Sequence, residues 1–136
     1  MDQRLSLVTL VVTDLDRSRA FYIDGLGWTA EVDVPGEVLM IRVGERLLLS
    51  LWQREHAEAE IGPVSAGGAP PLTLAHNVTE PAQVDAVLEL AAAAGGQVGT
   101  ASWRTWGGYS GYAVDPDGFR WEIAVNPTAL GESLLP

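Results

Sequence analysis

Glu122 is the residue whose type and position are best suited to chemistry in this chain. It stands in the middle of residues 119–125, where apolar and polar side chains alternate as they do along a β-strand. The alternation predicts that Arg120, Glu122 and Ala124 point to one face of that strand. If the face lines a cavity, the carboxylate needs a cation, a proton or hydrogen-bond donors, because burying a bare charge is costly. Such a carboxylate can bind a cationic group or serve as a general base; the alternative is a solvated face.

Aromatic side chains close to Glu122 in the sequence form a second group that suits ligand binding. The chain has five tryptophans, and Trp103 and Trp106 come shortly before Tyr109 and Tyr112. Such rings offer flat apolar walls to an aromatic or cationic molecule. The alternative is that Trp103 and Trp106 close one open end of a sheet.

Other catalytic arrangements find no support in the sequence. Cysteine is absent, which excludes a thiolate nucleophile, a cysteine metal site and a disulfide framework. No Ser-His-acid set can be recognised from the spacing. His56 falls in a segment interpreted as a linker and is expected on the surface. His76 is expected on the strand face opposite Thr73 and Asn77, and is interpreted as a structural histidine.

Charge and hydropathy narrow the classes of partner. Eight basic against 18 acidic residues give a net charge of −10, which disfavours nucleic acid and anionic membranes and slightly favours cationic ligands. No run approaches the ~20 apolar residues of a membrane span. Residues 1–4 lead directly into a strand pattern without a signal-type core, so a cytoplasmic protein is expected.

The elements that must position these residues occur in the same order twice. A strand, a helix and three strands are predicted for residues 5–12, 14–26, 28–34, 37–43 and 46–52, and again for residues 72–78, 79–94, 98–104, 109–114 and 119–125. The predicted boundaries within a single domain of residues 1–136 are a first module 4–53, a linker 54–70, a second module 71–127 and a tail 128–136. The repeat predicts an α+β fold in which two βαβββ modules share one curved mixed sheet.

Three stretches of the sequence resemble a known family. They are VVTDLDRSRAFYIDGLGW at 11–28, LTLAHNV at 72–78 and GYAVDPDGFRWEIAVNP at 111–127. With them, the chain resembles the vicinal oxygen chelate superfamily, the group of glyoxalases, bleomycin-resistance proteins and extradiol dioxygenases. The resemblance implies two βαβββ modules around a cavity, and pairing of modules within or between chains, from which we expect a homodimer.

Metal-using relatives take four metal ligands from matching strands of the two modules. The resemblance places these positions at Leu7, Ser50, Thr73 and Glu122. Only Glu122 is a strong ligand, since Leu7 offers no donor and the two hydroxyls are weak neutral oxygens. We therefore expect neither a tightly bound metal nor another cofactor.

The leading hypothesis is a metal-independent protein that sequesters an aromatic or cationic natural product, similar to bleomycin-resistance proteins and with a role in antibiotic resistance. The predicted ligand-binding residues are Leu7, Thr9, Ser50, Trp52, Thr73, Asn77, Trp103, Trp106, Tyr109, Tyr112 and Glu122. One alternative is a glyoxalase-like lyase or isomerase in which Glu122 is the general base, with or without a weakly held divalent metal. Another is a module with a vestigial cavity and a role in assembly.

Overall fold

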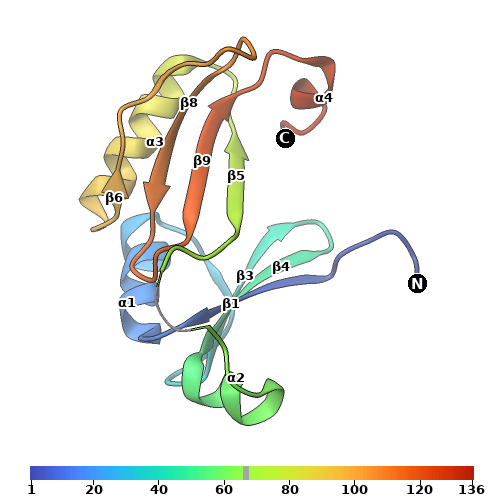
Figure 1. Ribbon diagram of the computed structural model, residues 1–136, viewed down its shortest axis with the longest axis vertical. Helices are drawn as coiled ribbons and strands as arrows, with labels where there is room; N and C mark the ends of the chain where they lie inside the picture. Colours follow the sequence, from blue (N-terminus) through green and yellow to red (C-terminus); the bar gives the residue numbers. More distant parts are fainter. Residues whose placement is uncertain (66–67) are drawn as a thin grey trace. The chain divides into compact units, whose positions relative to one another are not determined.

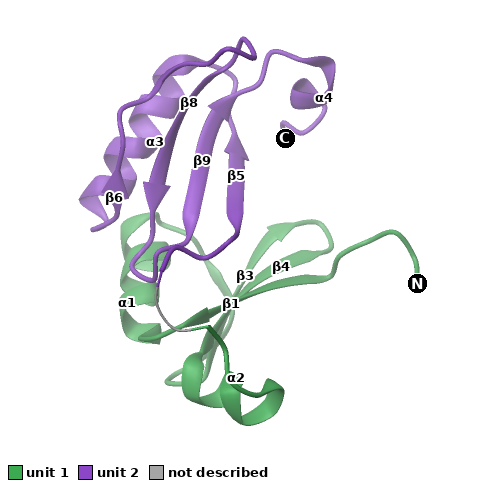
Figure 2. Ribbon diagram, in the orientation of Figure 1, with its two compact units in different colours: residues 1–67 green, residues 68–136 purple. Residues whose placement is uncertain are grey.

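The predicted order of strand, helix and three strands occurs twice in the computed structural model, which describes residues 1–65 and 68–136 (Figure 1). Each copy forms its own compact unit, the first of residues 1–67 and the second of residues 68–136 (Figure 2). Each unit contains one mixed sheet. The α+β class and the duplicated module are therefore confirmed, but the two modules do not share one sheet, because no strand of one unit pairs with a strand of the other among the described residues.

The first unit contains a four-stranded sheet in the order β1-β4-β3-β2. Its elements are β1 (Leu7–Val12), α1 (Leu15–Arg19), a π-helical turn η1 (Ala20–Gly25), β2 (Ala30–Val34), β3 (Val38–Gly44), β4 (Leu47–Gln53) and α2 (Arg54–Ile61). Strand β1 runs parallel to β4, and the other neighbours are antiparallel. Helix α1 contacts β3 and β4, so it covers one face of this sheet.

Side-chain hydrogen bonds fix the start of α1. Asp14 caps the helix, because its Oδ1 accepts from the backbone N–H groups of Asp16 at 3.0 Å and Arg17 at 3.1 Å. The Gln53 amide at the end of β4 accepts from the Leu15 N–H and donates to the Thr13 carbonyl, each at 3.0 Å. The last strand of the unit is thus tied directly to the beginning of its helix.

The second unit repeats this arrangement in the order β5-β9-β8-β6, with β7 also paired to β8. Its elements are β5 (Thr73–Asn77), α3 (Pro81–Ala93), β6 (Gln97–Val98), β7 (Ser102–Trp103), β8 (Tyr109–Val114), β9 (Arg120–Val125) and α4 (Ala129–Glu132). Strand β5 runs parallel to β9, as β1 does to β4. Helix α3 packs against β8, β9 and β6 and covers one face of the sheet (Figure 1).

Close packing of α3 on the sheet depends on Gly111. The helix buries Val84, Leu88 and Ala91. A Cβ atom on Gly111 would lie 2.5 Å from Leu88 Cδ1 and 3.1 Å from Ala101 Cβ. Both separations are below van der Waals contact, so the glycine lets the helix approach the middle of β8.

The segment predicted as a linker begins with a helix instead. Residues 54–61 form α2, in which an Arg54–Glu58 ion pair at 3.2 Å joins positions i and i+4. Ala57 is the buried residue of this helix. A helix that buries so little shows no apolar period, and the sequence pattern therefore missed it. Residues 66 and 67 of the predicted linker lie outside the described residues.

Two further boundaries differ from the prediction. The strand expected at 98–104 is two short strands, β6 and β7, which pair with opposite ends of β8. The tail contains α4, which is capped by the Thr128 hydroxyl. None of the helices in the described parts of the chain has the length and apolar character needed to cross a membrane.

We expect the substitution Gly111→Ala to lower the free energy of unfolding by about 1–3 kcal/mol, because Leu88 must move from a packed position. Gly99→Ala is the matched control, since a Cβ there has only the Tyr112 carbonyl at 4.0 Å and should change the stability by less than about 0.5 kcal/mol. Urea unfolding of the two variants measures the difference. Equal midpoints would contradict the proposed helix–sheet contact.

Candidate functional site

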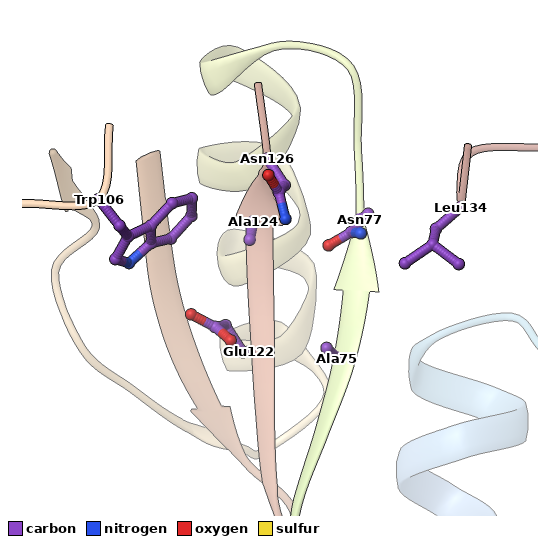
Figure 3. A pocket seen from close by; sticks show the side chains of 7 residues that line it. All are labelled: Ala75, Asn77, Trp106, Glu122, Ala124, Asn126 and Leu134. Carbon is purple, nitrogen blue, oxygen red and sulfur yellow. The ribbon is translucent and has the colours of Figure 1, made fainter. Parts of the chain in front are cut away.

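A pocket of ≈ 350 Å³ lies on the sheet face of the second unit that is opposite α3. Strands β5 and β9, the loop before β8 and the C-terminal segment supply its walls (Figure 3). The lining residues are Ala75, Asn77, Trp106, Glu122, Ala124, Asn126 and Leu134. Apolar and neutral polar groups thus surround one carboxylate, a composition typical of small-molecule sites.

Strand register places Glu122 in this pocket. Glu122 stands opposite Ala75 on β5 and opposite Tyr112 on β8. The next residue, Ile123, is 3 % exposed and pairs with Gly111, which faces α3. Because side chains alternate along a strand, Glu122 points away from the helix and toward the pocket, as its pattern predicts.

The Glu122 carboxylate has a phenol as its neighbour. The Tyr112 hydroxyl donates a hydrogen bond to Glu122 Oε1 at 3.1 Å. Burial raises the pKa of the Tyr112 phenol, and the hydrogen bond to the carboxylate raises it further. Tyr112 therefore remains a neutral donor at physiological pH. One carboxylate oxygen is held in place by this bond, while Oε2 is left for a ligand.

Trp106 forms the wall of the pocket on the β8 side of Glu122 (Figure 3). Its turn is closed by a hydrogen bond from the Gly107 N–H to the Arg104 carbonyl at 3.0 Å, and Gly107 has a φ of 94°. The indole lies on Gly108, where a Cβ would come within 1.7 Å of its Cζ3 atom. Only glycine at 108 is compatible with this position of the ring. The side chain remains 47 % exposed, so one surface of the indole is free to stack.

Not all predicted site residues reach the pocket. Asn77, Trp106 and Glu122 line it, and Tyr112 contacts Glu122. Trp103 and Tyr109 do not: they form a cross-strand pair whose rings are 5.3 Å apart, and the Tyr109 hydroxyl donates to Asp85 on α3 at 3.0 Å. These two aromatic residues lie on the helix side of the sheet.

The remaining predicted residues are not among those that line the pocket. Thr73 pairs with Arg120, which places it two register positions before Ala75, and it is exposed. The other four share one face of the first unit's sheet, opposite the face that α1 covers: Leu7, Thr9, Ser50 and Trp52. That these four residues and Glu122 belong to one ligand site stays a prediction.

The groups around Glu122 do not fit a divalent metal ion. A metal centre needs several strong donors that converge on one point. Beside Glu122 stand the Ala75 methyl group and the Tyr112 hydroxyl, which is already engaged as a donor. His76 lies on the opposite strand face, in register with Ile123. In the described part of the chain, no cluster of three or more His, Cys, Asp or Glu side chains is placed to hold a metal.

Arg104 is a charged residue of this face that sequence reasoning missed. Its Nε donates to the Ser110 hydroxyl and its Nη2 to the Ser110 carbonyl, both at 3.0 Å. Its guanidinium carbon lies 5.8 Å from the centre of the Tyr112 ring. Residues 68–136 contain only two basic residues, Arg104 and Arg120. An arginine within an aromatic stretch of an acidic module is the signal that could have identified it.

Comparisons with known proteins agree with this architecture. A sequence model of the Glyoxalase/Bleomycin resistance protein/Dioxygenase superfamily matches residues 4–123. A solved glyoxalase-related enzyme from Fulvimarina pelagi is 34% identical, with a TM-score of 0.84 and a match over 92% of this chain and 89% of that chain. No match was found among the curated proteins.

Two further solved structures share the fold at lower identity. A lactoylglutathione lyase from Agrobacterium tumefaciens is 24% identical, with a TM-score of 0.72 over 92% of this chain and 95% of that one. A glyoxalase/bleomycin resistance protein/dioxygenase from Nocardioides is 23% identical, with a TM-score of 0.75 over 92% and 84% of the two chains. The matched sequence model and the 34% identity to the Fulvimarina pelagi enzyme show that the chain belongs to the glyoxalase/bleomycin resistance protein/dioxygenase superfamily.

Proposed function

We propose that this protein binds a small aromatic or cationic molecule and sequesters it without changing it chemically. The observation that supports this proposal is the pairing of one carboxylate, Glu122, with the indole of Trp106 in a pocket of ≈ 350 Å³. That volume lies within the range of small-molecule sites. A role in resistance to a toxic natural product follows from sequestration, and a homodimer stays part of the proposal.

The two residues give the pocket two complementary preferences. Oε2 of Glu122 can accept from an ammonium or an amidinium group, and a charge-assisted hydrogen bond of this kind is stronger than a neutral one. The exposed surface of the Trp106 indole can stack on a flat ring or lie against a cation. Asn77 and Asn126 add neutral donors and acceptors that orient the guest.

The second candidate is a lyase or isomerase of the glyoxalase type. It is favoured by the 34% identity to a glyoxalase-related enzyme. In this reading the Glu122 carboxylate takes a proton from an acidic C–H bond of the substrate and returns it to a neighbouring atom. The residues near Glu122 do not supply a metal site, so the carboxylate would act as the base without a metal ion.

We expect proflavine, a planar aromatic cation, to quench the tryptophan fluorescence saturably. Trp106→Ala should weaken its binding by about 1–3 kcal/mol, because the stacking surface is removed. Trp103→Ala is the matched control: Trp103 is also exposed but packs beside Tyr109 on the helix side. Equal losses in the two variants, or no saturable quenching by proflavine, would count against a stacking role of Trp106.

Glu122→Gln should weaken the binding of proflavine at least several-fold and leave the neutral acridine at pH 8 nearly unaffected. The substitution removes the charge of the side chain but keeps its shape and its contact with Tyr112. Calorimetric titration of both dyes gives the comparison. The guest should be recovered unchanged by mass spectrometry. Turnover of the guest that disappears in Glu122→Gln with binding intact would favour the enzyme instead.

A further inference from the structure

Arg104 and Glu122 are oppositely charged residues on the pocket side of the same sheet, yet they are not bonded to each other. Tyr112 lies between them: the Arg104 guanidinium is 5.8 Å from the centre of its ring, and its hydroxyl bonds to Glu122. Tyr112 therefore contacts both charged groups, with its ring facing the guanidinium and its hydroxyl bonded to the carboxylate. Opposite charges kept apart in this way leave each free to bind a ligand group.

The Arg104 side chain is held rigidly. Both of its hydrogen bonds go to Ser110, a residue that is 1 % exposed and belongs to the pocket-side row of β8. Fixing Nε and Nη2 to one residue defines the plane of the guanidinium. A planar fork fixed before binding loses little entropy when it bonds to a ligand.

The guanidinium also keeps unused donors. An arginine has five N–H groups, and two of those on Arg104 go to Ser110. The chain is strongly acidic, and Arg19, Arg42 and Arg54 each pair with a carboxylate within 4 Å. Arg104 forms no such ion pair with any residue that the structure describes. Its outer edge, with donors on Nη1 and Nη2, matches the two oxygens of a carboxylate.

We propose that the pocket, together with Arg104, which lies on the same sheet face but outside the pocket lining, selects an amphoteric aromatic molecule, whose cationic group binds Glu122 and whose carboxylate binds the outer edge of Arg104. The aromatic body then spans the interval that Tyr112 occupies in the sheet and lies toward Trp106. This inference rests on the proposed binding function and adds the class of ligand. It makes Arg104 a specificity-determining residue, since a ligand that lacks the anion leaves these donors without a partner.

Three naphthalene probes with the same aromatic body test the proposal: 6-(aminomethyl)-2-naphthoic acid with both charges, 2-naphthylmethylamine with the cation alone, and 2-naphthoic acid with the anion alone. Calorimetry at pH 7 and low salt measures their affinities for the unaltered protein. We expect the amphoteric probe to bind about tenfold or more tightly than the amine, and the acid to bind weakest because of the net charge of −10.

Variants then test whether the higher affinity for the amphoteric probe comes from Arg104. Arg104→Gln should reduce the affinity for the amphoteric probe to that for the amine, and leave the amine unchanged. Arg120→Gln is the matched control, because Arg120 lies on the same strand face two residues from Glu122 and is exposed. The Arg120→Gln substitution should not change the affinity for any of the three probes. Arg104→Lys, which retains the charge but loses the fork, should keep part of the gain.

The outcomes separate this proposal from the proposed function. If the amine binds and depends on Glu122 but the amphoteric probe gains nothing, the ligand class is wrong and the binding function stands. An equal loss of amine and amphoteric binding in Arg104→Gln would make Arg104 a structural latch on Ser110 and overturn the inference. If none of the probes binds, the proposed function fails together with the inference. The comparison of probes on the unaltered protein keeps the test valid even if a variant does not fold.

Discussion

Parallel pairing of the first strand with the last is the constraint on which each unit depends. Strands β5 and β9 run in the same direction, and a chain that returns to make such a pair needs a crossover rather than a tight turn. Helix α3 belongs to that crossover and covers one face of the sheet, and the pocket lies on the opposite face. The alternation of side chains along β9 then decides that Glu122 stands on the pocket face and Ile123 in the core.

The site combines this rigid sheet with a short, tightly specified loop. Glu122 and Tyr112 are fixed by their neighbouring positions on β9 and β8, and a hydrogen bond joins them. Trp106 is fixed differently, because its ring rests on Gly108. Strand residues thus supply the carboxylate and its hydrogen-bond donor, and the loop supplies the aromatic wall. This division suits recognition by shape and charge. The donors beside Glu122 do not make a metal centre, which supports the proposed binding function over metal-assisted chemistry.

Local patterns were sufficient to predict the hairpin and the direction of Glu122. The turn at Asp115 can be predicted from the sequence because an aspartate at such a position accepts hydrogen bonds from nearby backbone groups. Its carboxylate accepts from the backbone N–H groups of Asp117 and Phe119. Other features depend on contacts distant in the sequence. The sheet face on which Trp103 and Tyr109 lie is set by their cross-strand pairing and by the hydrogen bond of Tyr109 to Asp85 on α3. The odd sequence spacing of Tyr109 and Tyr112 already indicates that these two tyrosines lie on opposite faces of the strand. The hydrogen bonds of Arg104 to Ser110 depend on a turn that brings two strand ends together. The alternation of apolar and polar residues in the sequence does not predict them.

We propose that the face of the second sheet opposite α3, around Glu122 and Trp106, is a ligand site. Nuclear magnetic resonance of the ¹⁵N-labelled protein titrated with proflavine tests it most directly, because each indole and side-chain amide gives its own signal. We expect saturable shifts of the Trp106 indole and of the Asn77 and Asn126 amides, with the Trp103 indole unmoved. Shifts confined to Trp103 and the helix side, or none up to millimolar proflavine, would contradict it.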